Sequence, residues 1–308
     1  MQKGYIREIR RFTTTDGQGI RTILYTLGCN LRCAWCSSPI TWKKQLQVYL
    51  NTELCNNCGL CADICPIGRY KREGNSIQID TSSHCVLCGR CISSCPQHSI
   101  SIIGQYVSSA EVLNMLLRDV FFYEETSGGV TLSGGEPLLQ FDFIREIIYG
   151  LLENNVPVSI ETNLSINWNK LKQVAVENVC FHVDLKHMDP ELHKALTGVD
   201  NILIHENIRR IRDSDAGLRI GYPYIPGFND SVENIDAMIT FLKDLRIPEI
   251  HLYPLHKLGV IEYNGIGLME KGAALSQIST CTNELIQRAV NLFSSNGIAV
   301  EVERITIS

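Results

Sequence analysis

Several features are scarce in this 308-residue chain, and each scarcity excludes a class of protein. No stretch approaches the roughly 18 consecutive apolar residues that a membrane-spanning helix requires. The first residues, Met1-Gln-Lys-Gly-Tyr5, lack the apolar core of a secretory signal peptide. Charge of one sign does not predominate, because 28 Lys and Arg stand against 33 Asp and Glu. The basic footprint of a nucleic-acid-binding protein is therefore absent, and we expect a cytoplasmic protein without membrane or nucleic-acid partners.

Cysteine, by contrast, is abundant and clustered. Eleven of the 13 cysteines fall between Cys29 and Cys95, and we interpret Cys180 and Cys281 as small apolar core residues. Disulfides are not expected in a reducing compartment, and a disulfide framework would spread its cysteines over the whole fold. The clustered cysteines are therefore predicted to bind metal.

The loop Cys29-Asn-Leu-Arg-Cys33-Ala-Trp-Cys36 follows the apolar run Ile23–Leu27, which predicts a buried strand ending at Gly28. Three thiolates at this spacing can bind three irons of a cubane cluster and leave the fourth iron open to a small molecule. A structural zinc site needs four protein ligands, and the loop holds no fourth Cys or His. We predict an open iron–sulfur cluster here; buried thiols or zinc ligands are the alternatives.

Residues 50–104 form a separate unit with an internal repeat of 30 residues. A C-x2-C-x2-C-x3-C-P run occurs twice, first from Cys55 to Pro66 and again from Cys85 to Pro96. Bacterial two-cluster ferredoxins have this spacing, and in them the fourth Cys of each run ligates the other cluster. The alternative is a pair of zinc ribbons. The ferredoxin spacing predicts one cluster on Cys55, Cys58, Cys61 and Cys95, and another on Cys85, Cys88, Cys91 and Cys65.

After residue 104 helical and strand patterns alternate, which predicts parallel β/α units. We expect strands at 129–133, 157–161, 179–185, 218–224, 249–253 and 299–303. We expect helices at 108–124, 141–153, 168–177, 190–196, 202–213, 232–245 and 273–295, the first beginning with a capping box. About six β/α units fall short of a full eight-fold barrel, and chemistry in such folds gathers at the strands' C-terminal ends. The predicted domains are 1–49 with 105–308, and 50–104.

The cysteine loop, Gly134-Gly135-Glu136-Pro137 and the β/α units resemble the radical S-adenosylmethionine (SAM) enzymes. Further segments narrow the resemblance to the glycyl-radical-enzyme activating enzymes, such as pyruvate formate-lyase activating enzyme. These segments are Asp16-Gly17-Gln18-Gly19-Ile20-Arg21, Asp184-Leu185-Lys186, Ile225-Pro226-Gly227 and Pro254–Gly259. The ferredoxin-like unit resembles the branch that activates glycerol dehydratase, choline lyase and arylacetate decarboxylases. Thr162-Asn163-Leu164 stands where the family commonly has Thr-Asn-Gly.

The resemblance implies an α/β fold: a partial (β/α)6 radical SAM barrel with an inserted ferredoxin-like domain that carries two [4Fe-4S] clusters. It implies an enzyme that cleaves SAM reductively to a 5′-deoxyadenosyl radical, which abstracts a Cα hydrogen from a glycine of a partner enzyme. The cofactors would be SAM, three [4Fe-4S] clusters and a monovalent cation. The partners would be a glycyl radical enzyme and a flavodoxin or ferredoxin as electron donor, and the chain itself would be a monomer.

The resemblance also implies contacts with SAM, but assigns no side chain as a catalytic acid, base or nucleophile. Trp35, Cys36 and Ser37 would lie against the adenine, and Trp35 could equally belong to the core. The remaining predicted contacts are Gly134, Gly135 and Glu136, then Asp184, Leu185 and Lys186, and finally His256 beside the adenosine. A monovalent cation would use Glu161, Thr162 and Asp184, and Arg21, Arg219 and Asn229 would contact the partner peptide.

Two other functions compete with this one. The first is a radical SAM enzyme with auxiliary clusters that acts on a peptide or a small molecule. Such enzymes often carry their extra clusters near the C-terminus, whereas here the insert follows the first cysteine loop, which disfavours this function. A non-enzymatic electron carrier would explain residues 50–104 but not the motifs at the strand ends. Cleavage of SAM by the reduced protein separates the carrier from both enzymes.

Overall fold

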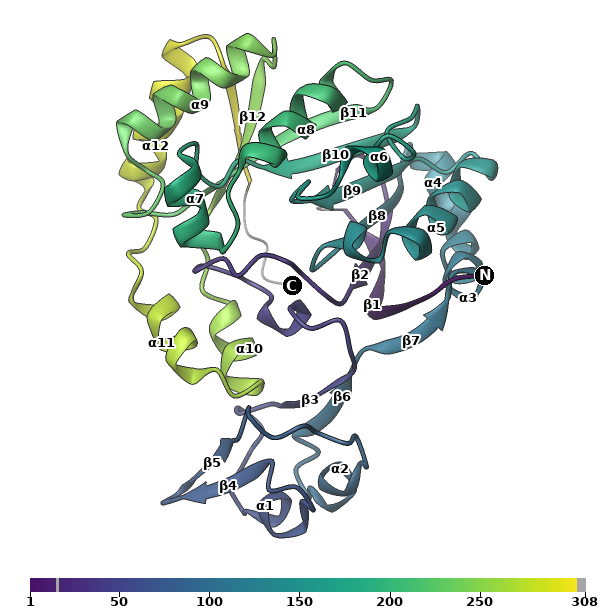
Figure 1. Ribbon diagram of the computed structural model, residues 1–308, viewed down its shortest axis with the longest axis vertical. Coiled ribbons are helices and arrows are strands. Elements are labelled where there is room, and N and C mark those ends of the chain that lie inside the picture. Colours follow the sequence, from purple (N-terminus) through teal and green to yellow (C-terminus); the bar gives the residue numbers. More distant parts are fainter. Residues whose placement is uncertain (15–16, 304–308) are drawn as a thin grey trace.

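The computed structural model describes residues 1–14 and 17–303, and its main body is built on a nine-stranded sheet (Figure 1). The strand order is β13-β12-β11-β10-β9-β8-β2-β1-β7. Within this sheet, β2, β8, β9, β10, β11, β12 and β13 pair in parallel, each with the next, whereas β1 pairs antiparallel with both β2 and β7. The bounds are β1 Lys3–Thr13, β2 Arg21–Thr26, β7 Gln105–Ser108, β8 Gly129–Gly134, β9 Val158–Thr162, β10 Val179–Asp184, β11 Gly217–Tyr224, β12 Glu249–Pro254 and β13 Ala299–Val302.

Alternating side chains give the sheet one apolar and one polar face. Leu24, Leu132 and Ile160 lie in register on β2, β8 and β9 and are fully buried in the main core. Helices pack on this face, and α5 (Phe141–Glu153) contributes Ile144 and Ile147 to the same core. The opposite face carries polar side chains such as Arg21, Thr131 and Ser159, which hydrogen-bond to one another. The C-terminal ends of the parallel strands lie at one edge of this polar face.

The remaining helices occur in the order that the chain alternation predicts. They are α3 Ser109–Leu116, α4 Val120–Thr126, α6 Trp168–Leu171, α7 Pro190–Thr197, α8 Ile202–Arg212, α9 Val232–Asp244, α10 Gly259–Gly265, α11 Met269–Gln277 and α12 Asn283–Ser295, with 3-10 turns η1 Pro39–Thr41, η2 Leu117–Asp119 and η3 Pro137–Gln140. The capping box predicted at Ser108 is present, because Ser108 and Glu111 satisfy each other's backbone N–H groups. Among the described residues, no helix is both long enough and apolar enough to cross a membrane.

Three predicted helices differ from the structure. The helix expected at 108–124 is broken at η2, where the carboxylate of Asp119 turns inward to Arg11 and Thr22. The helix expected at 168–177 is the single turn α6. The helix expected at 273–295 is two helices, α11 and α12, because the chain leaves helical geometry at Ile278 and α12 restarts at its cap Thr282. Another helix, α10, precedes α11 in a segment for which no helix was predicted.

The cysteine-rich segment projects below the main body as a smaller unit (Figure 1). The chain runs out along β3 (Gln47–Leu50) and returns along β6 (Ile100–Ile103), and these strands pair antiparallel. Between them lie the hairpin of β4 (Tyr70–Glu73) with β5 (Ser76–Ile79), and the short helices α1 (Leu60–Ile64) and α2 (Arg90–Ser94). Its small core includes cysteine side chains alongside Val48 and Leu50. The domain limits at residues 50 and 104 stay a prediction.

Candidate functional site

The loop from Gly28 to Cys36 begins where β2 ends and is held by backbone hydrogen bonds to two other segments. The N–H groups of Gly28 and Cys29 donate to the carbonyls of Thr41 and Trp42, at 2.7 and 3.2 Å. Further along, the N–H of Arg32 donates to the carbonyl of Thr197 at the end of α7, at 2.7 Å. Because η1 and α7 fix the loop from two sides, its three cysteines have defined positions.

Glycines bring neighbouring segments against this loop. A Cβ on Gly135 would lie 2.3 Å from the carbonyl oxygen of Gly28, and one on Gly134 would lie 2.4 Å from the backbone nitrogen of Thr26. A Cβ on Gly259, the first residue of α10, would lie 2.5 Å from the carbonyl oxygen of Cys36. Both segments therefore contact the loop through bare backbone, which no larger residue permits.

Glu136 joins the ends of β8 and β9 beneath the loop. Its side chain is 3% exposed and accepts hydrogen bonds from the N–H of Leu138, the hydroxyl of Thr162 and the N–H of Asn163. Burial raises the pKa of this carboxyl group, whereas the three donors favour its charged form. The side chain of Asn163 in turn donates to Asn30 of the loop at 2.9 Å. With its oxygens bonded in this way, Glu136 positions the loop.

Lys186 is a buried cation whose charge acts on the cysteine loop. Its Nζ lies 2.8 Å from Asp184 Oδ2, and its side chain is 13% exposed. Burial alone would lower the pKa of Lys186, but the negative charge of Asp184, and that of Cys33 and Cys29 when they are thiolates, raises it above its ordinary value. Lys186 therefore stays positively charged and faces both the carboxylate of Asp184 and the cysteines.

The thiols themselves are shielded from water. Burial raises the pKa of Cys33 to about 12 and that of Cys36 to about 11, and it also raises the pKa of Cys29. Free thiols with these pKa values are protonated at neutral pH, and a coordinated metal would deprotonate them. The site therefore suits thiols that are ligands better than thiols that are nucleophiles.

Sulfur spacing distinguishes a cluster from a single zinc ion. Thiolates on one tetrahedral zinc lie within about 4 Å of one another, because Zn–S bonds are about 2.3 Å long. In the described part of the chain, no three cysteines bring their sulfurs within 4.8 Å of one another; Glu249, His251 and Glu301 form the group that meets this limit. Arg219 contacts two of these side chains, because its Nε donates to His251 Nε2 at 2.8 Å and its Nη2 lies 3.7 Å from Glu301 Oε2. The wider cysteine spacing fits a cluster, in which each thiolate binds a different iron.

The remaining predicted SAM contacts have mixed surroundings. His256 Nδ1 is buried and has no hydrogen-bond partner among the described residues, and burial lowers the pKa of this imidazole. An unsatisfied buried ring nitrogen of this kind suits a ligand that can hydrogen-bond to it. Ser37 is exposed, whereas Leu185 is buried in the main core and can contact a ligand only through its backbone. Trp35 is 7% exposed and packs in a small core with Ile225 and Tyr263, the alternative that the sequence left open.

Sequence reasoning missed Trp42. Its indole hydrogen-bonds to the thiol of Cys36, and the side chains of Arg32 and Lys271 lie over its ring at 5.0 and 4.8 Å. A hydrogen bond to a ligand sulfur tunes an iron–sulfur cluster, so Trp42 belongs to the site. Its signal in the sequence is a lone tryptophan six residues after Cys36, which no motif marks.

The residues predicted to contact a partner peptide do not lie together in one exposed site. Arg21 is 5% exposed and donates to Thr131, Ser159 and the carbonyl of Val130 on the polar face. Asn229 is 1% exposed and uses its side-chain amide for the turn after β11, so a peptide contact would require breaking those bonds. Arg219 lies on the polar face with His251. Asp16 of the motif lies outside the described residues.

Two hollows in the insert gather the cysteine sets that the repeat predicts. One, of about 340 Å³, is lined by Cys65, Cys85, Cys88 and Cys91. The other, of about 280 Å³, is lined by Cys55, Cys58, Cys61 and Cys95. Each set combines three cysteines of one run with the fourth of the other, the exchange expected of a two-cluster ferredoxin. The donor sets therefore fit two clusters, although the ligation stays a prediction.

Comparisons with known proteins agree with this reading. Residues 84–241 match the radical SAM superfamily, and residues 47–96 match a 4Fe-4S dicluster domain. The chain is 33% identical to the isethionate sulfite-lyase activating enzyme of Oleidesulfovibrio alaskensis, covering 94% of this chain and 93% of the relative. It is 35% identical to the indoleacetate decarboxylase activating enzyme of Tractidigestivibacter scatoligenes, over 86% of this chain and 87% of the relative. Streptococcus suis SuiB bound to precursor peptide SuiA shares the fold, with a TM-score of 0.55 and 13% identity over 92% of this chain and 48% of that chain.

Proposed function

The chain belongs to the radical SAM superfamily and, within it, to the glycyl-radical-enzyme activating enzymes. From this we propose which of its residues hold the cluster and which bind SAM. Members of this family cleave SAM reductively and place a radical on a glycine of a partner enzyme, and this is the activity of the chain. The observation that carries our assignment is the convergence of Cys29, Cys33 and Cys36 with the charged pair Asp184 and Lys186 at the strand ends.

In our assignment the three loop cysteines bind one [4Fe-4S] cluster. When bound, such a cluster supplies one electron and an iron with an open position, to which the amino and carboxylate groups of SAM can bind. Gly134 and Gly135 hold the loop at the end of β8, and Glu136 connects it to β9. The chain thus fixes the geometry and excludes water, while the chemistry belongs to the cofactors.

Two side chains are assigned to SAM itself. The ammonium of Lys186 is buried and charged and is paired with the carboxylate of Asp184, so it can attract the carboxylate or ribose of SAM. His256 Nδ1 offers an unsatisfied hydrogen-bonding atom to the adenosine. The main argument for both is position, because β10 and the segment after β12 end at the same edge of the sheet as the cysteine loop.

Several finer features remain part of the proposal. We assign three [4Fe-4S] clusters to the chain, a partial barrel to the sheet, and a flavodoxin or ferredoxin as the electron donor. A monovalent cation could use Glu161, Thr162 and Asp184, but Glu161 accepts from Ser133 and Thr162 donates to Glu136. Binding of a cation there would have to share those oxygens.

The partner is a glycyl radical enzyme, and the relatives activate enzymes with different substrates. A panel for the test therefore consists of isethionate sulfite-lyase, indoleacetate decarboxylase and (2S)-3-sulfopropanediol dehydratase, each made with Cα-deuterated glycine. With reduced protein and SAM, we expect an electron paramagnetic resonance (EPR) signal of a glycyl radical in the correct partner. Deuterium should move into 5′-deoxyadenosine in step with that signal.

The matched variants are Cys33→Ala, which should abolish both readouts, and Cys180→Ala, which lies outside the three cysteine sets and should leave them unchanged. Radical formation without deuterium in the nucleoside would contradict direct abstraction. If the protein cleaves SAM at a rate that no glycyl radical enzyme changes, an enzyme acting on a small molecule or peptide becomes the better assignment.

A further inference from the structure

The two halves of the insert share a backbone plan but differ in the side chains around their hollows. Gly59 and Gly89 are 30 residues apart and both cap a short helix with positive φ, at 80° and 73°. Four residues after the last cysteine of each run, the repeat places Arg69 in one half and Ser99 in the other. The next position holds Tyr70 in the first half and Ile100 in the second. The repeat is therefore symmetric in its cysteines and asymmetric in charge.

Arg69 is a buried cation beside one hollow. Its side chain lines the hollow of Cys65, Cys85, Cys88 and Cys91, and the residue is 9% exposed. Nη1 donates to the carbonyl oxygens of Asp80 and Ser83, at 2.5 and 3.4 Å. Nε is buried and has no hydrogen-bond partner among the described residues. None of the ion pairs in the described part of the chain includes Arg69, and the nearby carboxylate of Asp80 is bonded to Lys71 instead.

Tyr70 adds a second donor on the same side. It is 3% exposed and lines the same hollow, with its hydroxyl within hydrogen-bonding reach of the thiol of Cys91. Its counterpart Ile100 has no polar atom to offer. The other hollow has a neutral contact between Ser99 Oγ and Cys95 Sγ at 3.2 Å. A guanidinium also lies near Gly59 there, that of Arg72, but it is half-exposed and bonded to Asp63 at 2.7 Å.

Reduction adds one negative charge to a cluster, and hydrogen bonds to its sulfurs and nearby positive charge favour that state. A buried guanidinium acts strongly because water screens it poorly, whereas the exposed pair of Arg72 and Asp63 is screened and nearly neutral. Building on the two-cluster assignment above, we propose that Arg69 and Tyr70 raise the reduction potential of the cluster held by Cys65, Cys85, Cys88 and Cys91 above that of its neighbour. An electron that enters the insert therefore comes to rest on this cluster.

The test needs each insert cluster alone in the full-length chain. The variant in which Cys29, Cys33 and Cys36 are Ala removes the SAM-binding cluster. Adding Cys58→Ala then leaves the cluster beside Arg69, and adding Cys88→Ala leaves the other; both cysteines are exposed and occupy equivalent positions. Redox titration followed by EPR should give the higher potential for the first protein. Iron analysis of the parent variant tests the two-cluster assignment separately, with about eight irons per chain expected.

Substitutions then connect the difference to the named side chains. In the protein that retains the cluster beside Arg69, Arg69→Gln should lower the ratio of reduced to oxidised cluster at fixed potential by about tenfold, because it removes a buried positive charge beside the cluster. Tyr70→Phe should lower it in the same direction by less. Neither change should move the other cluster, and Lys71→Met, which removes an exposed cation from the same strand, should move neither.

Equal potentials for the two isolated clusters would overturn the proposal. So would a shift for Arg69→Gln no larger than that for Lys71→Met. If Arg69→Gln fails to retain iron, Arg69→Lys and Tyr70→Phe decide instead, because both keep the packing, and an unchanged potential in Tyr70→Phe would again be decisive against it.

Discussion

Close backbone contact accounts for the glycines at the end of β8. From the sequence, Gly134 and Gly135 were expected to let the backbone approach SAM. The structure shows that a Cβ on Gly135 would strike the carbonyl of Gly28 at 2.3 Å, so the first partner of this glycine is the cysteine loop. Both requirements favour the same residue, and the sequence could not distinguish them because each predicts a glycine at a strand end.

The contact at Gly135 predicts a specific defect. Gly135→Ala should displace the cysteine loop and lower the occupancy of its cluster, so we expect a loss of up to about a third of the bound iron with loss of SAM cleavage. Gly297→Ala is the control, since it adds a Cβ in open space at φ 80° and should cost only about 1 kcal/mol of stability. Iron analysis and a SAM-cleavage assay read out both variants. Full iron content in Gly135→Ala would show that the loop adapts.

The backbone conformation of Leu164 and the contact of Trp42 with Cys36 could not be predicted from the local sequence. Leu164 has a φ of 55° and is fully buried, so it adopts the left-handed conformation at the position where the family commonly has glycine. Burial of its side chain offsets that backbone strain, and no local pattern announces it. Trp42 contacts Cys36 through a turn whose geometry depends on η1 and α10, which is tertiary information.

Among the elements, the long and strongly periodic segments were predictable and the short ones were not. The bounds predicted for α5 are those observed, and every predicted strand after residue 104 is present. By contrast, β1 was missed because Lys3–Thr13 is rich in arginine and half-exposed, so its alternation is weak. Antiparallel pairing with β2, rather than its own alternation of apolar and polar residues, makes this segment a strand.

One ion pair connects β1 to the broken helix and predicts a dependence on pH. Asp119 is fully buried and accepts from Arg11 and Thr22, and its hydrogen bond with Arg11 lowers the pKa of the carboxyl group. A lowered pKa gives stability that is present above the unfolded-state pKa of about 3.9 and is lost as pH falls through the folded-state pKa. The wild-type chain should therefore lose this contribution only in acid.

Asp119→Asn should lower the free energy of unfolding at pH 7. Arg11 is 44% exposed, so we expect about 2 kcal/mol, less than the loss at a fully buried pair. Urea unfolding followed by fluorescence should show the difference from wild type at pH 7 and a smaller difference as the pH falls below about 4. The exposed pair of Asp142 and Arg145 supplies the control Asp142→Asn, which should change stability by under about 0.5 kcal/mol. A difference that does not depend on pH would mean that the carboxylate charge has no role.

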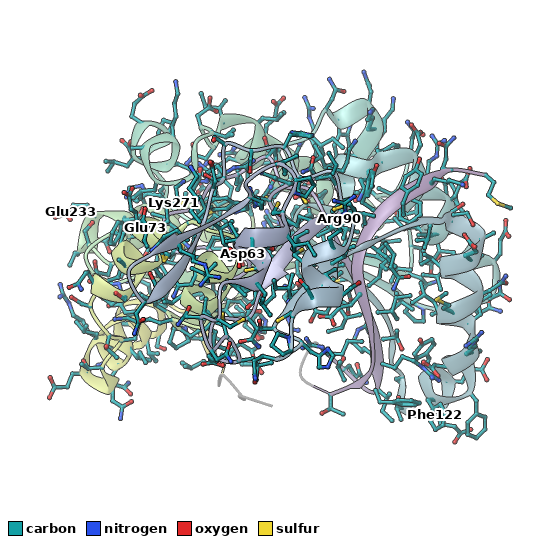
Figure 2. All side chains as sticks on the ribbon, turned by 90° about the horizontal axis from the view of Figure 1, so that it is seen from below. Asp63, Glu73, Arg90, Phe122, Glu233 and Lys271 are labelled. Atoms are coloured by element: carbon teal, nitrogen blue, oxygen red, sulfur yellow. The ribbon has the colours of Figure 1, made fainter. Side chains whose placement is uncertain are left out.

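At the scale of the molecule, the chain separates two tasks in space. In our assignment the main body carries the SAM site at the strand ends, and the insert projects from the main body on β3 and β6 (Figure 1). Figure 2 looks onto the insert, where Asp63 and Arg90 lie near the centre of the view and Phe122 lies at the periphery. Cys58 and Cys88 are the exposed cysteines of the described chain, and both lie on this unit. The insert therefore presents its hollows to solvent, where a protein donor could reach them.

Iron content tests this division directly. Three cubane clusters imply about twelve irons per chain. Replacing Cys29, Cys33 and Cys36 by Ala should remove about a third of the iron and all SAM cleavage, because the insert keeps its own ligands. Cys281→Ala is the control and should retain all the iron, since this thiol hydrogen-bonds to the backbone of Leu255 and Tyr224 and lies outside the three cysteine sets. Cleavage that survives the triple substitution would show that the SAM site has been misplaced.

The last prediction asks whether the insert passes electrons or shapes the docking of a partner. If its clusters relay electrons, Cys58→Ala and Cys88→Ala should slow SAM cleavage driven by a reduced flavodoxin or ferredoxin. The same variants should keep their rate with a small chemical reductant, which can reach the SAM cluster without the insert. If the insert only shapes docking, SAM cleavage should keep its rate with either donor, while formation of the glycyl radical on the partner falls. Because Arg69 and Tyr70 face only one hollow, a relay should also respond unequally to the loss of the two clusters. Unchanged folding, cleavage and radical formation in both variants would exclude the two roles together.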